Sequence, residues 1–158
     1  MQNQIIEIRR ELVLNAPIEK VWDAVSNPES WTAWFSYAVE GRFAPGEVVR
    51  LDMGSDFFCS AEILEMEAPR RMVYRWHPGE DCAIDAYPAE EMTTVTFTME
   101  PVGDQTRFTV VETGFERIPE PRREKAVRLN NQGWTPVLAD LTKWVEQGVR
   151  QVRKANAG

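Results

Sequence analysis

The sequence contains few of the residues from which metal and disulfide sites are built. Its 158 residues include only two cysteines, Cys59 and Cys82, and a single histidine, His77. The cysteines do not form a CxxC pair, so a structural zinc ion would lack ligands. We therefore expect reduced thiols, no bound metal and no cofactor.

Long hydrophobic runs and an excess of positive charge are also missing. No stretch approaches the roughly 18 consecutive apolar residues of a membrane span, and residues 1–7 lack the basic and apolar regions of a secretion signal. The 18 basic and 25 acidic side chains give a formal charge of −7, which opposes binding to nucleic-acid phosphates. These absences predict a cytoplasmic protein with no membrane span and no nucleic-acid partner.

Catalytic signatures are absent as well. The sequence has no nucleophile elbow, P-loop, dinucleotide fingerprint or HExxH motif. What it does have is a hydrophobic content of 43%, with six Trp, seven Phe and three Tyr, which is typical of a chain that folds around a core. At this length we expect one domain that spans residues 1–158.

The hydrophobic pattern predicts an α+β fold. Apolar residues alternate through Ile5–Leu14, which indicates a strand, and a proline-led helix follows at residues 17–25, with a second short helix from Pro28 to Trp34. Alternation then dominates from residue 38 to residue 115. It predicts six strands joined by short turns: Val39–Phe43, Val48–Met53, Phe57–Glu67, Arg71–His77, Met92–Pro101 and Thr106–Phe115.

The last part of the chain, from about Pro119 to Val152, has helical periodicity. Apolar residues such as Trp134, Leu138 and Leu141 fall on one face of this helix. Pro136 lies inside the segment, cannot donate a backbone hydrogen bond and clashes with the preceding turn. We expect the helix to kink or break there.

Three segments in this order resemble motifs of a known superfamily: Leu14–Trp22, Ile63–Trp76 and Asn131–Leu141. They are similar to the helix-grip (START-like, SRPBCC) superfamily, and most of all to bacterial homologues of the activator of the heat-shock chaperone ATPase. The resemblance covers about residues 5–146. It implies a curved antiparallel sheet of about seven strands around a long C-terminal helix, with two short helices after the first strand.

The resemblance leaves the function open, because proteins of this superfamily carry ligands, run a few reactions or bind other proteins. The leading expectation is binding of a small hydrophobic or amphipathic molecule in a cavity between the sheet and the C-terminal helix. One alternative is a cyclase- or dehydratase-type enzyme that uses the same pocket, with catalytic residues unknown. Another is an interaction module that binds a chaperone. A homodimer is possible, and no sequence feature decides it.

Aromatic residues are the first candidates for the lining of such a cavity, although each could belong to the core instead. A strongly curved sheet around one helix can leave a gap at its open end, and we expect the lining of the cavity there. The candidates are Trp34, Phe35, Tyr74, Trp76 and Trp134.

Three polar residues are further candidates. Glu112 shares the apolar face of its strand, so its carboxylate needs a partner, with Arg10 a candidate, or it lines a polar spot in the cavity. Asn130 precedes Trp134 and could offer its amide to a ligand or cap a helix end. His77 is either a general base or, as we expect, a histidine at the rim or surface.

Overall fold

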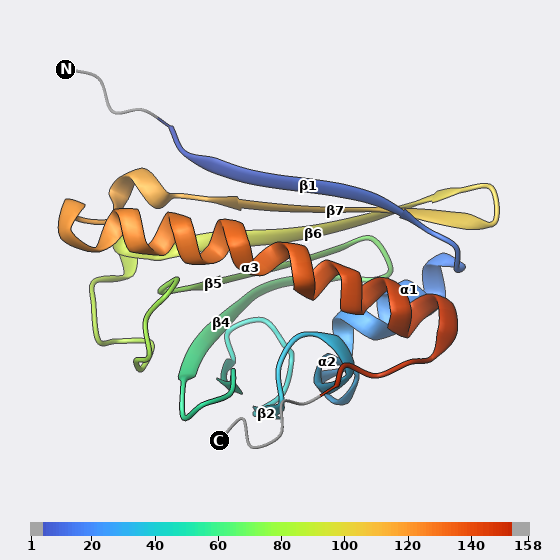
Figure 1. Cartoon of the computed structure of the whole chain (residues 1–158), viewed down its shortest axis with the longest axis horizontal. Helices are drawn as coiled ribbons and strands as arrows, with labels where there is room; N and C mark the ends of the chain where they lie inside the picture. Colours follow the sequence, from blue (N-terminus) through green and yellow to red (C-terminus); the bar gives the residue numbers. More distant parts are fainter. Residues whose placement is uncertain (1–4, 153–158) are drawn as a thin grey trace.

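The computed structural model describes residues 5–152, in which seven strands form one antiparallel sheet. The strand order across the sheet is β1-β7-β6-β5-β4-β3-β2, so every strand except β1 pairs with a neighbour in sequence, and β1 pairs with β7. The sheet is long and curved (Figure 1). Its strands are β1 (Glu7–Leu14), β2 (Ala38–Glu40), β3 (Val48–Asp52), β4 (Phe58–Glu67), β5 (Arg71–Trp76), β6 (Thr93–Val102) and β7 (Gln105–Thr113).

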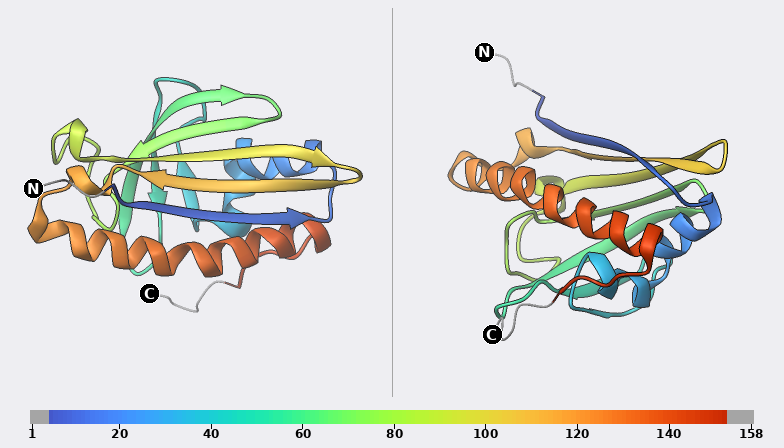
Figure 2. Two further views of the ribbon diagram at one scale, coloured as in Figure 1. Left: turned by 90° about the horizontal axis from the view of Figure 1, so that it is seen from above. Right: turned by 45° about the vertical axis from the view of Figure 1, so that its right-hand side comes forward.

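The helices cover one face of this sheet. The long helix α3 (Glu120–Gln147) crosses the face, and α1 (Ile18–Ser26) and α2 (Pro28–Trp34) lie beside its C-terminal part (Figures 1 and 2). Two short 3-10 helices, η1 (Ala89–Glu91) and η2 (Phe115–Arg117), flank β6 and β7. This arrangement confirms the predicted α+β fold with a sheet wrapped around a C-terminal helix. No helix within residues 5–152 is long and apolar enough to cross a membrane.

Local sequence signals place the two short helices. Pro28 occupies the first turn of α2, and the side chain of Asn27 caps that helix by accepting a hydrogen bond of 3.0 Å from the backbone N–H of Glu29. Two tryptophans of α2 then join it to α1. The indole of Trp31 donates to the carbonyl of Val25, at 2.7 Å, and that of Trp34 donates to the carbonyl of Ala24, at 2.9 Å.

The core lies between the helices and the concave face of the sheet. It contains a cluster of aromatic rings that contact one another at tilted and edge-to-face angles, the geometry that aromatic pairs prefer. Trp31, for example, contacts Tyr74 and Phe97 with ring-centroid distances of 5.8 and 6.3 Å. All three side chains are fully buried.

Helix α3 differs from the prediction at Pro136 and at its end. The helix continues through Pro136 without a break. Pro136 and Gln132 are both exposed, so the carbonyl of Gln132, which loses its usual donor four residues on, faces water. The helix ends at Gln147 and not near Val152, because Gly148 adopts a left-handed conformation with φ of 70°.

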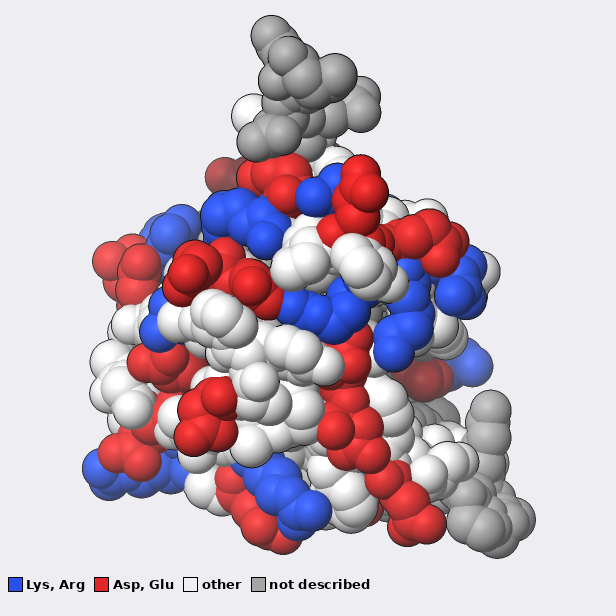
Figure 3. Space-filling view, turned by 90° about the vertical axis from the view of Figure 1, so that its left-hand side faces the viewer, with Lys and Arg blue, Asp and Glu red and all other residues white. Residues whose placement is uncertain are grey.

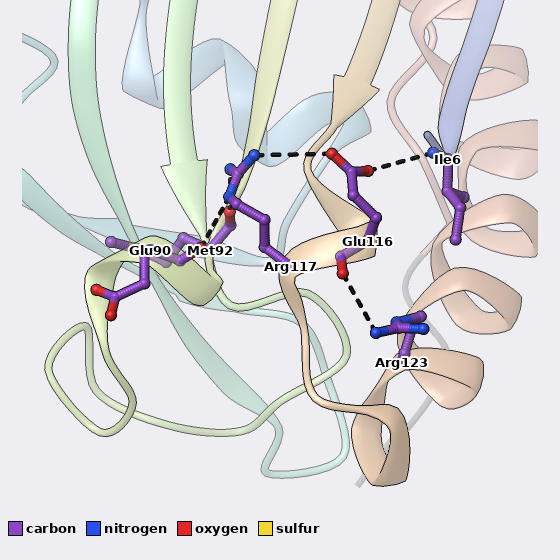
Figure 4. Close-up of polar contacts among 6 residues, drawn as sticks. All are labelled: Ile6, Glu90, Met92, Glu116, Arg117 and Arg123. Atoms are coloured by element: carbon purple, nitrogen blue, oxygen red, sulfur yellow. Dashed lines mark hydrogen bonds and ion pairs between the residues drawn. The ribbon is translucent and has the colours of Figure 1, made fainter. Parts of the chain in front are cut away.

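The connection between β5 and β6, residues 77–92, folds back onto the start of α3. The guanidinium of Arg122 lies 3.7 Å from the centre of the Tyr87 ring and forms an ion pair with Glu91. Arg117 donates to the backbone carbonyls of Glu90 and Met92, at 2.9 and 3.3 Å (Figure 4). We call residues 77–92 the β5–β6 loop.

The short helix η2 connects the residue before β1 to the start of α3. Glu116 accepts a hydrogen bond of 3.2 Å from the backbone N–H of Ile6, and its own carbonyl accepts one of 3.2 Å from Arg123 (Figure 4). Acidic and basic side chains alternate over this end of the molecule, without a large patch of one sign (Figure 3). This end is therefore held together by many short polar contacts.

Candidate functional site

A pocket of about 160 Å³ opens between α3 and the sheet. Its walls come from the end of α2, the turn between β3 and β4, the end of β5 and the middle of α3. Nearly all of them are apolar, and Asn130 is the one polar side chain among the residues that line it. The lining residues are Phe35, Met53, Trp76, Leu129, Asn130, Gly133, Trp134 and Val137.

Helical spacing explains the contribution of α3. Leu129, Gly133, Trp134 and Val137 follow one another at intervals of four, one and three residues, which places them on one face of the helix. Gly133 matters because it has no side chain to fill the pocket. A Cβ atom there would meet no heavy atom within 4 Å. The glycine therefore keeps space open.

Glu112 lies beneath this wall, at the end of β7, and its side chain is completely buried. Its Oε2 atom accepts hydrogen bonds from the indole of Trp76, at 2.9 Å, and from the hydroxyl of Thr93, at 2.7 Å. Its Oε1 atom accepts from the indole of Trp134, at 2.9 Å. The amide of Asn130 donates to both oxygens, at 3.0 and 2.8 Å.

Each of these four hydrogen-bond partners of Glu112 is thus a donor without a positive charge. An indole N–H can only donate, and an ionised carboxylate can only accept, so the two kinds of group match. Several hydrogen bonds of this kind offset the cost of burying the carboxylate. Glu112 thereby holds the indole of Trp76 in the sheet and that of Trp134 in the helix, and both residues line the pocket.

The predicted partner of Glu112 was wrong. Arg10 donates instead to the backbone carbonyl and the side-chain oxygen of Asn131, at 3.0 and 2.8 Å. On β1 it lies opposite Val110, whereas Ile8 lies opposite Glu112. The indole, amide and hydroxyl donors occupy both carboxylate oxygens, so no cation is needed.

The structure brings five of the seven candidate residues together. Phe35, Trp76, Asn130 and Trp134 line the pocket. Glu112 lies below and accepts hydrogen bonds from the last three of these residues. Trp34 and Tyr74 are fully buried and do not line it. Trp34 belongs to the contact between α1 and α2 described above.

Sequence reasoning missed Met53, Leu129, Gly133 and Val137 as lining residues, and Thr93 as a donor. The helical spacing around Trp134 was a signal that could have indicated the three residues of α3. It could not indicate Met53 or Thr93, because their positions depend on how the strands curve toward the helix. Asn130 lies inside α3 and its side chain reaches Glu112, so it is not a helix-end cap.

His77 is the other correction, because it is not a surface residue. Only 3% of it is exposed, since the β5–β6 loop folds over it. Its Nε2 atom lies 3.1 Å from the carbonyl oxygen of Ile84, and its ring contacts that of Tyr87 edge-on at 5.4 Å. Burial, the largest effect, lowers the pKa of His77 from its ordinary value.

The two cysteines have little thiolate character. Burial raises the pKa of Cys59 to about 12, and burial also raises the pKa of Cys82. Within residues 5–152, no group of three or more His, Cys, Asp and Glu side chains is placed to hold a metal ion.

Comparison with known proteins identifies relatives of this fold. The family model described as "Activator of Hsp90 ATPase homolog 1-like protein" matches residues 15–146. A comparison of the sequence with curated proteins finds no match.

Several solved structures are similar. The Aha1 dimer from Colwellia psychrerythraea has a TM-score of 0.73 at 15% identity, over 90% of this chain and 98% of that one. CalU16 from Micromonospora echinospora has a TM-score of 0.67 at 22% identity, over 91% of this chain and 78% of that one.

DynU16, a protein in the dynemicin biosynthetic locus, has a TM-score of 0.71 at 23% identity, over 91% of this chain. The alignment spans 48% of DynU16, about half of its length. At these identities the similarity establishes the shared fold.

Proposed function

The chain belongs to the family of activator of Hsp90 ATPase homolog 1-like proteins, and on this premise we propose that it binds a small hydrophobic or amphipathic molecule in the pocket between α3 and the sheet. The observation that carries the proposal is the pocket itself. It is apolar, it lies between the two main layers of the fold, and a network of hydrogen bonds through Glu112 holds its indole walls in place. Small-molecule sites commonly combine an apolar lining with a few polar groups.

The volume limits the size of the ligand. At about 160 Å³ the pocket resembles an apolar cavity of about 150 Å³, which accepts a molecule of the size of benzene. Drug-sized ligands occupy pockets of roughly 300–1,000 Å³. We therefore infer a ligand with a single ring, or one ring of a longer molecule that extends past Leu129, which is 38% exposed.

Asn130 gives the pocket a polar contact. Its Nδ2 atom is bound to both oxygens of Glu112, so the amide oxygen is the atom that it can offer to a ligand. A ligand with a hydroxyl or amine group near the mouth can donate to that oxygen. This contact supports an amphipathic ligand as well as a purely hydrophobic one.

The experiment compares two substitutions on the same helix. Gly133→Leu places an isobutyl group in the open space of the pocket, whereas Thr135→Leu places it on the exposed face. Binding of toluene and ethylbenzene is measured by NMR titration of the backbone amides. We expect binding to the wild type and to Thr135→Leu, with at least a tenfold loss in Gly133→Leu.

Two results would contradict the proposal. One is the absence of any chemical-shift change in the wild type at millimolar ligand. The other is equal binding by the two leucine variants, which would place the ligand elsewhere. Circular dichroism of both variants checks that the fold is retained.

The family description favours a second candidate function, an interaction module for a chaperone ATPase. The similar Aha1 from Colwellia psychrerythraea carries that name too. The test is the ATPase rate of a bacterial heat-shock chaperone of the Hsp90 type with and without this protein. An unchanged rate at saturating protein would exclude this function.

An enzymatic use of the pocket has less support from the geometry. Glu112 is the acidic side chain at the pocket, and it is fully buried with both oxygens hydrogen-bonded. To move a proton for a substrate, it would have to lose some of the donors that hold the pocket wall. We also propose that binding needs no second domain, because all of the lining residues belong to this sheet and its helices.

A further inference from the structure

The hydroxyl of Tyr74 is a buried polar group with no hydrogen-bond partner among residues 5–152. Tyr74 is in β5, its side chain faces the core, and the residue is fully buried. A hydroxyl in such a place costs free energy unless it is hydrogen-bonded. A phenylalanine would supply the same aromatic ring without the cost of the buried hydroxyl.

The position of Tyr74 relates this hydroxyl to the pocket. Its ring packs against Trp76, with centroids 5.0 Å apart, and against Phe35, with centroids 6.5 Å apart. Both of these residues line the pocket. A single layer of side chains thus separates the tyrosine from the space that a ligand would occupy.

Two polar residues lie near enough to act on the hydroxyl electrostatically. Burial is the main cause that raises the pKa of Tyr74 well above its ordinary value, followed by the charge of Glu112 and then by Cys59. The phenol is therefore protonated throughout the physiological range. It can donate one hydrogen bond to a group that reaches it.

We propose that the Tyr74 hydroxyl is the polar specificity determinant of the pocket, and that the ligand is a neutral ring compound with a carbonyl oxygen that accepts its hydrogen bond. The inference rests on the proposed binding function. The ligand would reach the hydroxyl by displacing the side chain of Phe35, which lines the pocket and packs against the ring of Tyr74. Phe35 follows the last residue of α2, where one side chain can move without unwinding the helix.

The chemistry of the surroundings selects this ligand class. An anionic group is disfavoured because the buried carboxylate of Glu112 acts on the same place. A hydroxyl group would bring a donor of its own, which would need a further acceptor beneath the wall. A carbonyl oxygen only accepts, so it satisfies Tyr74 and leaves no donor unpaired.

The test uses acetophenone and α-methylstyrene, which have the same shape but differ in a C=O and a C=CH₂ group. Dissociation constants of both are measured by NMR titration for the wild type and for Tyr74→Phe. We expect the substitution to weaken acetophenone about five- to tenfold, the typical value of one hydrogen bond, and to leave α-methylstyrene unchanged. Equal effects on both ligands would overturn the inference.

The wild-type protein provides a measurement that does not depend on the variant. The infrared carbonyl stretch of ¹³C-labelled acetophenone should move to lower frequency in the bound state, relative to the same compound in hexane. An unshifted stretch would mean that no donor reaches the oxygen and would overturn the inference.

The melting temperature of the ligand-free proteins completes the test. We expect Tyr74→Phe to melt at the same temperature as the wild type or higher, because it removes an unsatisfied buried hydroxyl. A melting temperature several degrees lower would show that the hydroxyl has a partner within the folded protein, such as a buried water, and would contradict the inference. If neither ligand binds the wild type, the proposed function fails; if both bind without discrimination, only this inference fails.

Discussion

At the scale of single residues, Glu112 joins parts of the fold that are far apart in the sequence. It accepts hydrogen bonds from Trp76 of β5, Thr93 at the start of β6, and Asn130 and Trp134 of α3. A neutral side chain at this position would accept fewer of these hydrogen bonds, and the donor side chains would change their positions. This explains why a charged residue lies on the apolar face of β7, where hydrophobic residues would otherwise be expected.

Glu112→Gln is predicted to destabilise the protein by about 1–3 kcal/mol. The glutamine keeps the shape but replaces one carboxylate oxygen with an NH₂ group, which then faces N–H or O–H donors and leaves at least one of them unsatisfied. Urea unfolding followed by tryptophan fluorescence measures the change.

Thr93→Val is the matched control for Glu112→Gln. It removes one of the donors, at 2.7 Å from Oε2, and leaves the carboxylate with its indole and amide partners. We expect a smaller loss of stability, about 1 kcal/mol. Equal stability of Glu112→Gln and the wild type would refute the assigned role of the carboxylate.

At the scale of elements, regular patterns were predictable and irregular ones were not. The alternation in β4 and β6 predicts those strands to within two residues, because one face of each is buried. The β5–β6 loop has five acidic side chains and no periodicity, which is typical of a solvated segment. Its contacts with α3, such as the stacking of Arg122 on Tyr87, depend on tertiary structure and have no local signal.

Pro136 illustrates the same limit within a helix. The local rule predicts a break, since proline cannot donate to the preceding turn. The helix continues because buried residues on either side, Trp134 and Leu138, pack against the sheet and the short helices. Packing over the whole length of α3 outweighs one missing hydrogen bond at an exposed position.

The β5–β6 loop is predicted to make stability depend on pH through His77. Burial lowers its pKa in the folded protein, with a smaller contribution in the same direction from Arg122, whereas the loop's backbone groups and Glu91 act in the opposite direction. The unfolded chain, with an ordinary histidine pKa of about 6.5, therefore takes up a proton first as the pH falls. Stability is fully present above about pH 6.5 and decreases below it.

The comparison of the wild type with His77→Gln isolates this effect, because His77 is the only histidine in the chain. Glutamine offers an N–H that can still donate to the carbonyl of Ile84, but it does not titrate. Unfolding free energies are measured at pH 8.0 and pH 5.5. We expect the wild type to lose more stability over this interval than the variant, and identical losses would show that His77 does not contribute.

At the scale of the whole molecule, the order of elements and the general position of the pocket were predictable. Three ordered motifs indicated the fold, and four of the pocket's lining residues, Phe35, Trp76, Asn130 and Trp134, were among the candidates. The depth of the pocket was not predictable. The depth depends on whether each aromatic ring packs against another ring or borders open space. Trp34 and Tyr74 pack against other rings and so do not line the pocket.

The segment after α3 contacts the end of α2, next to a residue that lines the pocket. Gly148, with its positive φ, turns the backbone so that residues 149–152 run back to α2. The backbone N–H of Gln151 donates to Ala33, at 2.8 Å, and its side chain donates to the carbonyls of Thr32 and Ser36, at 3.1 and 3.0 Å. These carbonyls lie at the end of α2, beside Phe35.

Gln151→Ala is therefore predicted to weaken both the fold and the pocket. Loss of two side-chain hydrogen bonds should lower the free energy of unfolding by about 1–2 kcal/mol, measured in urea. Because the carbonyls of α2 would lose their donors, Phe35 should become more mobile, and hydrogen exchange of the α2 amides should speed up. Arg150→Ala is the control, since its exposed hydrogen bond to Thr32 should be worth less than about 0.5 kcal/mol. If Gln151→Ala behaves like Arg150→Ala in both measurements, the segment after α3 merely rests on α2, and the wall at Phe35 is held by the aromatic core alone.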